Sequence, residues 1–173
     1  GQQLEGLRRA HRGGLFDCQD RYLSGQELGE EELLWSREYG PGGAYEFWSL
    51  GQPKVEIENL CHELQLEELQ GFSAVILGCG LGLDVAHLAR RATGASDTLA
   101  VCGVDFAWAA IKAARRNHKD TAGCFFYHAD VCELPAPKVP LDLVIDNTVF
   151  QNVYRSGRLD AYLQTRKRIS TAG

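Results

Sequence analysis

From residue 72 onward, the chain alternates between short apolar runs and segments whose apolar residues have helical spacing. The strand-sized apolar runs cover residues 73–77, 99–104, 124–127 and 141–145. Continuous runs of this length are typical of strands that are covered on both faces of a sheet. The segments with helical spacing cover residues 83–92, 107–117 and 156–169. This alternation predicts right-handed βαβ crossovers, and therefore an α/β fold with a parallel sheet and flanking helices.

The N-terminal part has a different pattern, in which charged helical stretches are separated by glycine-rich breaks. Helices are expected at residues 4–12, 16–23 and 30–39, and an apolar stripe with helical spacing follows at 53–69. Pro53 stands near the start of that stripe, where proline is tolerated in a helix. We therefore divide the chain into a helical and loop segment, residues 1–52, and the α/β part, residues 53–173.

Composition and charge limit the classes of partner. Hydrophobic residues make up 45% and charged residues 24% of the chain, as is usual for a soluble globular protein. No stretch predicts a membrane span or a signal peptide, and the net charge of −5 argues against nucleic acid as a partner. The six cysteines have the spacing of neither a zinc site nor a disulfide framework. Reduced thiols and a cytoplasmic location are expected, without a metal.

A glycine-rich turn follows the first predicted strand and opens a helix, with the sequence Leu77-Gly78-Cys79-Gly80-Leu81-Gly82. Glycine allows a tight bend and a close approach of a ligand to the main chain, and the helix start offers amide donors. The spacing is GxGxG and differs from the dinucleotide fingerprint GxGxxG, because position 83 is Leu. The turn favours a nucleoside-cofactor site, and a simple strand-to-helix link is the alternative.

An aspartate follows each of the other predicted strands. Asp105 can accept both hydroxyls of a ribose, or it can cap the following helix. Asp130 can accept a hydrogen bond from an adenine amino group with Val131 or Cys132 beside the ring, or it can form a local Asx-turn. Asp146 ends the fourth strand. Because ligands bind beyond the carboxyl ends of parallel strands, these side chains are expected to share one site.

The order of these motifs resembles the class I S-adenosylmethionine-dependent methyltransferase family over residues 53–173, with its Rossmann-like sheet. Several segments resemble the thiopurine S-methyltransferase-like subgroup, namely 35–39, 47–48, 51–53, 77–80, 104–105, 129–135 and 141–150. In that subgroup the N-terminal segment lies over the cofactor and the substrate. The resemblance therefore implies that residues 1–52 form a cap and that Trp35, Phe47 and Trp48 help to close the pocket. Packing in a core is the alternative for each of these aromatic residues.

The resemblance implies S-adenosyl-L-methionine as the cofactor. The residues expected to bind it are Trp35, Leu77, Gly78, Cys79, Gly80, Gly82, Asp105, Phe106, Asp130, Val131 and Asp146. A methyl group on a positive sulfur is already activated, so the protein mainly supplies alignment and a dry pocket. A soft, thiol-like or halide nucleophile needs little help from a base. For an oxygen or amine nucleophile, Asp146 is the expected base, with Asn147 as the second catalytic candidate.

Two positions depart from the family pattern. Ile76 stands where many methyltransferases have an acid, and Asn147 stands where the thiopurine subgroup often has a basic residue. The chain also shows only four predicted strands, in the expected order 3-2-1-4, while the family's sheet is larger. We therefore expect the N-terminal portion of a methyltransferase domain, a fragment whose fourth strand is an exposed apolar edge. A second chain or self-association at that edge is expected, with poor stability of the chain alone.

The leading expectation is methyl transfer to a small-molecule acceptor. A protein lysine methyltransferase is the second enzyme hypothesis. A non-catalytic methyltransferase-like module, which binds a partner through its open sheet edge, is the alternative from another class. A nicotinamide oxidoreductase is disfavoured by Leu83 and by the lack of a substrate domain.

Overall fold

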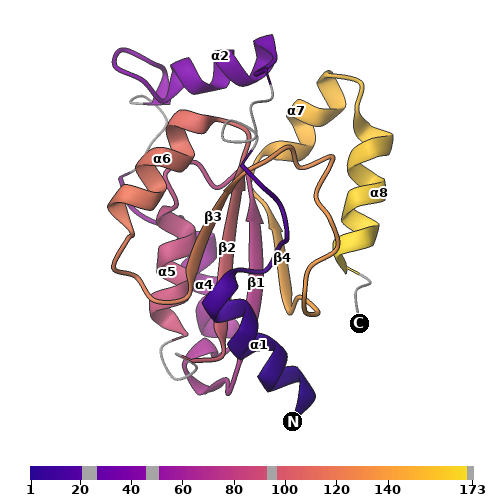
Figure 1. Cartoon of the computed structure of the whole chain (residues 1–173). Coiled ribbons are helices and arrows are strands. Elements are labelled where there is room, and N and C mark those ends of the chain that lie inside the picture. Colours follow the sequence, from indigo (N-terminus) through magenta and orange to yellow (C-terminus); the bar gives the residue numbers. More distant parts are fainter. Residues whose placement is uncertain (21–26, 46–50, 93–96, 171–173) are drawn as a thin grey trace.

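The computed structural model describes residues 1–20, 27–45, 51–92 and 97–170, which fold around one parallel sheet (Figure 1). Its strands are β1 (Phe72–Leu77), β2 (Leu99–Asp105), β3 (Cys124–His128) and β4 (Leu143–Asp146). They lie in the order β3-β2-β1-β4, and each neighbouring pair is parallel. The predicted α/β class, the four strands and their order are confirmed.

Helices pack around this sheet. They are α1 (Gln2–Gly13), α2 (Glu30–Glu38), α4 (Val55–Glu63), the short 3-10 helix η1 (Leu66–Glu68), α5 (Leu83–Arg91), α6 (Trp108–Asn117), α7 (Val149–Arg155) and α8 (Leu159–Ser170). The sequence did not predict α7 as a separate helix. It begins directly after β4, where Asp146 Oδ1 accepts hydrogen bonds from the main-chain N–H groups of Val149 and Phe150.

The two faces of the sheet are covered by different parts of the chain. On β1, Val75 and Leu77 belong to one hydrophobic cluster, and Ala74 and Ile76 belong to the other, as strand alternation requires. Helices α4, α5 and α6 cover the face with Ile76. Residues 15–16, the loop 129–139 and the pair α7 and α8 cover the opposite face.

The helix expected at residues 16–23 is wrong over its described part, because residues 15–20 are irregular. The reason is tertiary packing. The side chains of Leu15 and Phe16 are 0% and 2% exposed, and the Leu15 carbonyl accepts a hydrogen bond from Lys138 N at 2.8 Å. Phe16 also packs edge-on against Tyr127, with 5.7 Å between the ring centroids. These residues therefore belong to the core of the α/β part.

Strand β4 forms one edge of the sheet. It pairs with β1, and within the described ranges no other strand pairs with it. All four of its residues are half-buried. Nearby, α7 and α8 expose the large side chains of Phe150, Tyr154 and Leu163, which are 50%, 64% and 49% exposed. This side of the molecule therefore presents an unpaired strand beside apolar surface.

All six cysteines are free thiols, and four of them are buried. Burial is the main cause that raises the pKa of Cys18 and of Cys132 to about 11, and that of Cys124 to about 12. None of the described helices has both the length and the apolar character that crossing a bilayer requires.

Candidate functional site

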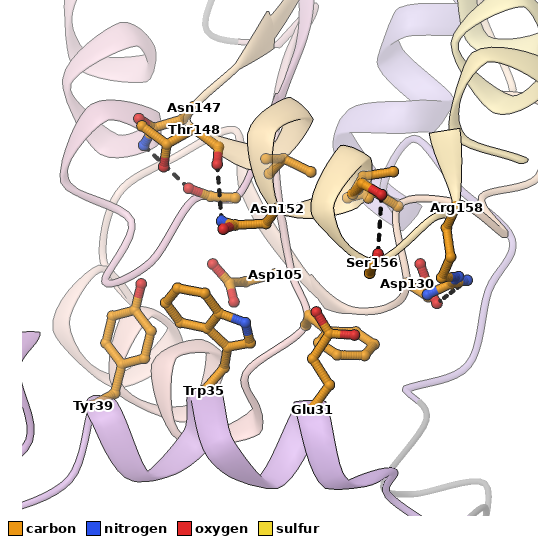
Figure 2. A pocket seen from close by; sticks show the side chains of 15 residues that line it. Glu31, Trp35, Tyr39, Asp105, Asp130, Asn147, Thr148, Asn152, Ser156 and Arg158 are labelled. Carbon is orange, nitrogen blue, oxygen red and sulfur yellow. Dashed lines mark hydrogen bonds and ion pairs between the residues drawn. The ribbon is translucent and has the colours of Figure 1, made fainter. Parts of the chain in front are cut away.

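A cavity lies at the carboxyl ends of the strands, between α2 and α7 (Figure 2). We call it the strand-end cavity; its open volume is about 680 Å³, including the part open to solvent. Its lining consists of Glu31, Trp35, Tyr39, Gly78, Asp105, Phe106, Asp130, Val131, Asn147, Thr148, Val149, Asn152, Val153, Ser156 and Arg158. This is the edge of a parallel sheet at which ligands bind.

Helix α2 forms one wall of the strand-end cavity. Glu31, Trp35 and Tyr39 are spaced four residues apart, so they share one helix face, and Figure 2 shows them in a row opposite Asn147 and Asn152. The spacing was visible in the sequence, but only Trp35 was singled out as a site residue. Burial is the main cause that raises the pKa of Tyr39 well above its usual value, so this phenol stays protonated.

A buried carboxylate fixes α2 to the sheet. The Glu32 side chain is 1% exposed, and its Oε2 accepts a hydrogen bond from Gly29 N at 2.8 Å, at the start of the helix. Its Oε1 lies 3.8 Å from Nε2 of the fully buried His128, the last residue of β3. The same His128 nitrogen lies 3.1 Å from the Phe106 carbonyl. Helix α2 is therefore anchored beside the strand-end cavity.

The glycine-rich turn contributes more to the shape of the site than to its supply of hydrogen-bond donors. Gly78 has φ 74°, and a Cβ atom there would lie 2.8 Å from the Asn147 carbonyl, so the turn and the end of β4 approach closely. The N–H groups of Gly78 and Cys79 both donate to the Val104 carbonyl, and Gly82 N donates to Cys79 O. These amides of the turn are thus used within the fold.

Asp105 connects the glycine-rich turn to α6. Its Oδ2 accepts a hydrogen bond from Gly80 N, and its Oδ1 accepts one from Ala107 N, both at 2.8 Å. Burial raises the pKa of Asp105, although these hydrogen bonds act against the rise. A third main-chain N–H, that of Phe106, also acts on this carboxylate, which leaves about one of its roughly four acceptor positions for a ligand. The N-cap of α6 is Ala107, without a side-chain cap, so the expected capping role of Asp105 is wrong, while its carboxylate lines the strand-end cavity.

Asp130 forms the local Asx-turn that is the alternative to a hydrogen bond with adenine. Its Oδ1 accepts a hydrogen bond from Cys132 N at 2.8 Å, and its Oδ2 pairs with an Arg158 guanidinium nitrogen at 2.6 Å (Figure 2). Arg158 follows α7 and was not expected at the site. The ion pair brings the loop after β3 to the start of α8, and Val131 lines the cavity beside it.

A second cavity adjoins the first on the side of the glycine-rich turn, and six residues line both. We call it the adjoining cavity; its lining adds Tyr45, Gln52, Lys54, Cys79, Gly80, Leu81, Leu83, Asp84, Gln151 and Arg155. The Lys54 ammonium donates to Asn147 Oδ1, and Lys54 N donates to Asp84 Oδ1 at 2.9 Å. Asn147 Nδ2 donates to the Gly78 carbonyl at 3.1 Å. A positive charge therefore stands at the end of β4 although position 147 is not basic.

Thr148 is a strained residue that the sequence did not indicate. Its φ of 65° lies in the left-handed region, which is unfavourable for a β-branched side chain. It precedes α7 and lines both cavities. Strain of this kind is often retained at functional sites.

The structure gathers most of the expected site residues at the two cavities and leaves three out. Leu77 is fully buried in the core, and Gly82 packs against Phe126. Asp146 lines neither cavity, because its Oδ1 caps α7 and its Oδ2 accepts the Tyr162 hydroxyl. Its expected role as a base stays a prediction without a lining position to support it. Phe47 and Trp48 lie outside the described residues.

The family profile described as "Methyltransferase domain" matches residues 74–173. A search among curated proteins found no matching relative. One similar solved structure, titled for the conversion of a disulfide bond into a thioacetal group during echinomycin biosynthesis, is 26% identical with a TM-score of 0.55. The match covers 80% of this chain and 53% of that chain, so the present chain spans about half of that protein's length.

Two further similar structures show the same fold. Magnesium protoporphyrin IX methyltransferase from Synechocystis PCC 6803, with bound S-adenosylmethionine, is 18% identical with a TM-score of 0.54, over 83% of this chain and 68% of that chain. A methyltransferase from Thiobacillus denitrificans, in complex with S-adenosylhomocysteine, is 17% identical with a TM-score of 0.51, over 69% of this chain and 45% of that chain. The profile match covers more than half of the sequence, and it agrees with the strand order and the position of the cavity. The chain therefore belongs to the methyltransferase domain family.

Proposed function

We propose that this domain transfers the methyl group of S-adenosylmethionine to a small molecule with a soft, thiol-like nucleophile. The observation that carries the proposal is the position of Asp105 in the wall of the strand-end cavity, beside the glycine-rich turn. A ribose offers two neighbouring hydroxyl donors, which match such a carboxylate. The bound cofactor would supply a methyl group that positive sulfur has already activated.

The other walls fit the remaining parts of the cofactor. Phe106 and Val131 provide apolar contacts for a purine ring, and Asp130 provides an acceptor at the same end of the strand-end cavity. Trp35 and Tyr39 cover the middle from α2, which excludes water from the reacting atoms. Leu77, Cys79, Gly80 and Gly82 shape the turn beneath.

The charges around the adjoining cavity favour an anionic nucleophile. Lys54 and Arg155 line this cavity, and Arg155 forms no ion pair with any described residue. The acid in this lining, Asp84, accepts a hydrogen bond from Lys54 N. Nearby cations favour the thiolate over the thiol, and a thiolate needs no general base. A reaction without a general base agrees with the hydrogen bond that the Asp146 carboxylate accepts from the Tyr162 hydroxyl. Asn147 is then the residue that orients Lys54.

A sulfur acceptor also agrees with one comparison. The 26% identical structure concerns the conversion of a disulfide bond into a thioacetal group, which is chemistry at sulfur. Together with the motifs shared with the thiopurine S-methyltransferase-like subgroup, this supports a small thiol as the acceptor. A protein lysine acceptor would require a deprotonating group near Asn147, and the acid in the same lining, Asp84, is only 8% exposed and accepts the Lys54 N–H.

Calorimetric titration with S-adenosylmethionine tests the cofactor site. We expect saturable binding of one ligand per chain, lost in Asp105→Ala and retained in Asp160→Ala, an exposed acid on α8. Circular dichroism on each variant confirms that the fold persists. Equal affinity of the Asp105→Ala variant would refute the site assignment.

Transfer of a labelled methyl group to matched thiol, alcohol and amine acceptors then tests the acceptor class. We expect turnover with thiols, reduced by Arg155→Ala mainly through a higher KM. Turnover with amines or with a lysine peptide, and none with thiols, would favour the alternative enzyme.

A further inference from the structure

Three metal-binding side chains meet on the face of the sheet that α4 and α5 cover. Glu58 and Cys61 stand three residues apart on α4, and His87 lies on α5. One ligand atom from each of them lies within 4.8 Å of the other two. The two helices are in contact and lie side by side in Figure 1. None of the three residues lines either cavity described above.

We propose that Glu58, Cys61 and His87 form a binding site for a thiophilic divalent cation such as Zn²⁺. A thiolate, an imidazole and a carboxylate are the ligands that zinc takes, at about 2.0–2.3 Å. His87 Nε2 and Glu58 Oε2 already pair with each other. An ion would enter between this pair and the Cys61 sulfur, and in tetrahedral geometry its ligand atoms would lie about 3–4 Å apart. Residues at i and i+3 share a helix face, so Glu58 and Cys61 point toward the same neighbour.

The exposure of the three side chains suits an ion that enters from solvent. Cys61 is 2% exposed, whereas the side chains of His87 and Glu58 are 21% and 49% exposed. The sulfur thus forms the floor of the site, and the other two ligands form its rim. A fourth position faces solvent, where a water molecule completes the coordination.

One cation already lies nearby and must be accommodated. An Arg91 guanidinium nitrogen lies 3.7 Å from Glu58 Oε1, and the other pairs more closely with Glu67 Oε1, at 2.5 Å. Arg91 can therefore stay on Glu67 when Glu58 turns to an ion. Burial and the charge of Glu58 raise the pKa of Cys61, while Arg91 acts against the rise. Metal binding would release the thiol proton, so affinity should increase with pH.

An ion at this position would reinforce a contact between α4 and α5 that Glu58 already makes with His87 and Arg91. Before α4, Lys54 N also donates a hydrogen bond to Asp84 in the first turn of α5. Lys54 and Asp84 both line the adjoining cavity. Metal binding should therefore raise the melting temperature of the domain, because the ion binds the folded form.

Titration of the reduced full chain with Co²⁺ tests the proposal, since a Co²⁺–thiolate bond gives an absorption band in the near ultraviolet. We expect one Co²⁺ per chain, displaced by Zn²⁺, with a band that is lost in Cys61→Ser. The band should remain in Cys124→Ser, the matched control, which removes a half-buried thiol from β3.

Two rim variants keep the test independent of the buried cysteine. His87→Ala and Glu58→Gln should each weaken Co²⁺ binding by about tenfold or more, while Glu63→Gln, an exposed acid on the same helix, should not. No saturable band at micromolar Co²⁺ would overturn the proposal. So would a band that persists in Cys61→Ser, or an unchanged affinity in both rim variants.

Discussion

Asp105 shows how one side chain serves the fold and the site together. Its two oxygens accept the N–H groups of Gly80 and Ala107, so the carboxylate fixes both the glycine-rich turn and the start of α6. Burial raises its pKa, which is the cost of placing this charge where a ligand can reach it. Its position in the sequence was enough to single out Asp105 as a candidate site residue, because it is an acid at the end of the second predicted strand. The role of Lys54 could not be found this way, because only the tertiary fold brings it to Asn147.

Gly78 is the turn residue with the clearest steric requirement. In Gly78→Ala the new Cβ would meet Val149 Cγ2 at 2.5 Å and the Asn147 carbonyl at 2.8 Å, in addition to the unfavourable φ of 74°. We expect a loss of about 2–5 kcal/mol in the free energy of unfolding, measured by urea denaturation.

Gly157→Ala is the matched control for that substitution. Its φ is 71°, but nothing lies within 4 Å of the added atom, so only the backbone penalty of about 1–2 kcal/mol applies. An equal loss of unfolding free energy in Gly78→Ala and Gly157→Ala would show that the close approach of Gly78 to the end of β4 does not affect stability.

Among the elements, the strands and the helices α1 and α2 were predictable, and the buried piece at residues 15–20 was not. Continuous apolar runs identified β1 and β2, whose residues are all buried, because such strands need apolar side chains on both faces. Residues 1–52 have no comparable pattern. Within this segment, α2, Tyr39, Tyr45 and Gln52 contribute to the cavity linings, while Leu15 and Phe16 fill the core. A short buried piece between two helices shows no periodic pattern of apolar residues in the sequence. Helix α7 is also too short for such a pattern, and its start depends on the hydrogen bond from Val149 N to Asp146.

The core role of Phe16 can be measured directly. Phe16→Ala should lower the free energy of unfolding by about 3–5 kcal/mol, because it removes a buried ring that packs against Tyr127. Leu34→Ala, on the exposed side of α2 at 54% exposure, should change it by no more than about 0.5 kcal/mol. A small effect of Phe16→Ala would mean that the N-terminal segment is a detachable cap after all.

At the scale of the whole molecule, the two sides of the sheet differ. On the β3 side, α6 packs on the strand and Arg115 holds Asp20 through two hydrogen bonds, at 2.6 and 2.8 Å. On the β4 side, the strand is unpaired within the described ranges and its neighbours expose Phe150 and Leu163. An open edge with apolar surface favours association through that side.

We expect concentration-dependent self-association of the chain, measured by sedimentation velocity. The double substitution Phe150→Ser and Leu163→Ser should weaken it. The matched pair Leu33→Ser and Leu34→Ser, which lies on α2 with 43% and 54% exposure, should leave it unchanged. A monomer at every concentration, or an equal effect of both pairs, would contradict association at the β4 side.

The six free cysteines have one more consequence. Alkylating reagents attack the thiolate, and in this fold burial keeps the thiols both covered and protonated at neutral pH. The folded chain should therefore be nearly inert toward such reagents, despite its many sulfur atoms. Each opening of the structure exposes thiols of ordinary acidity, which then react irreversibly. The alkylation rate of each cysteine therefore measures how often the part of the structure around it opens.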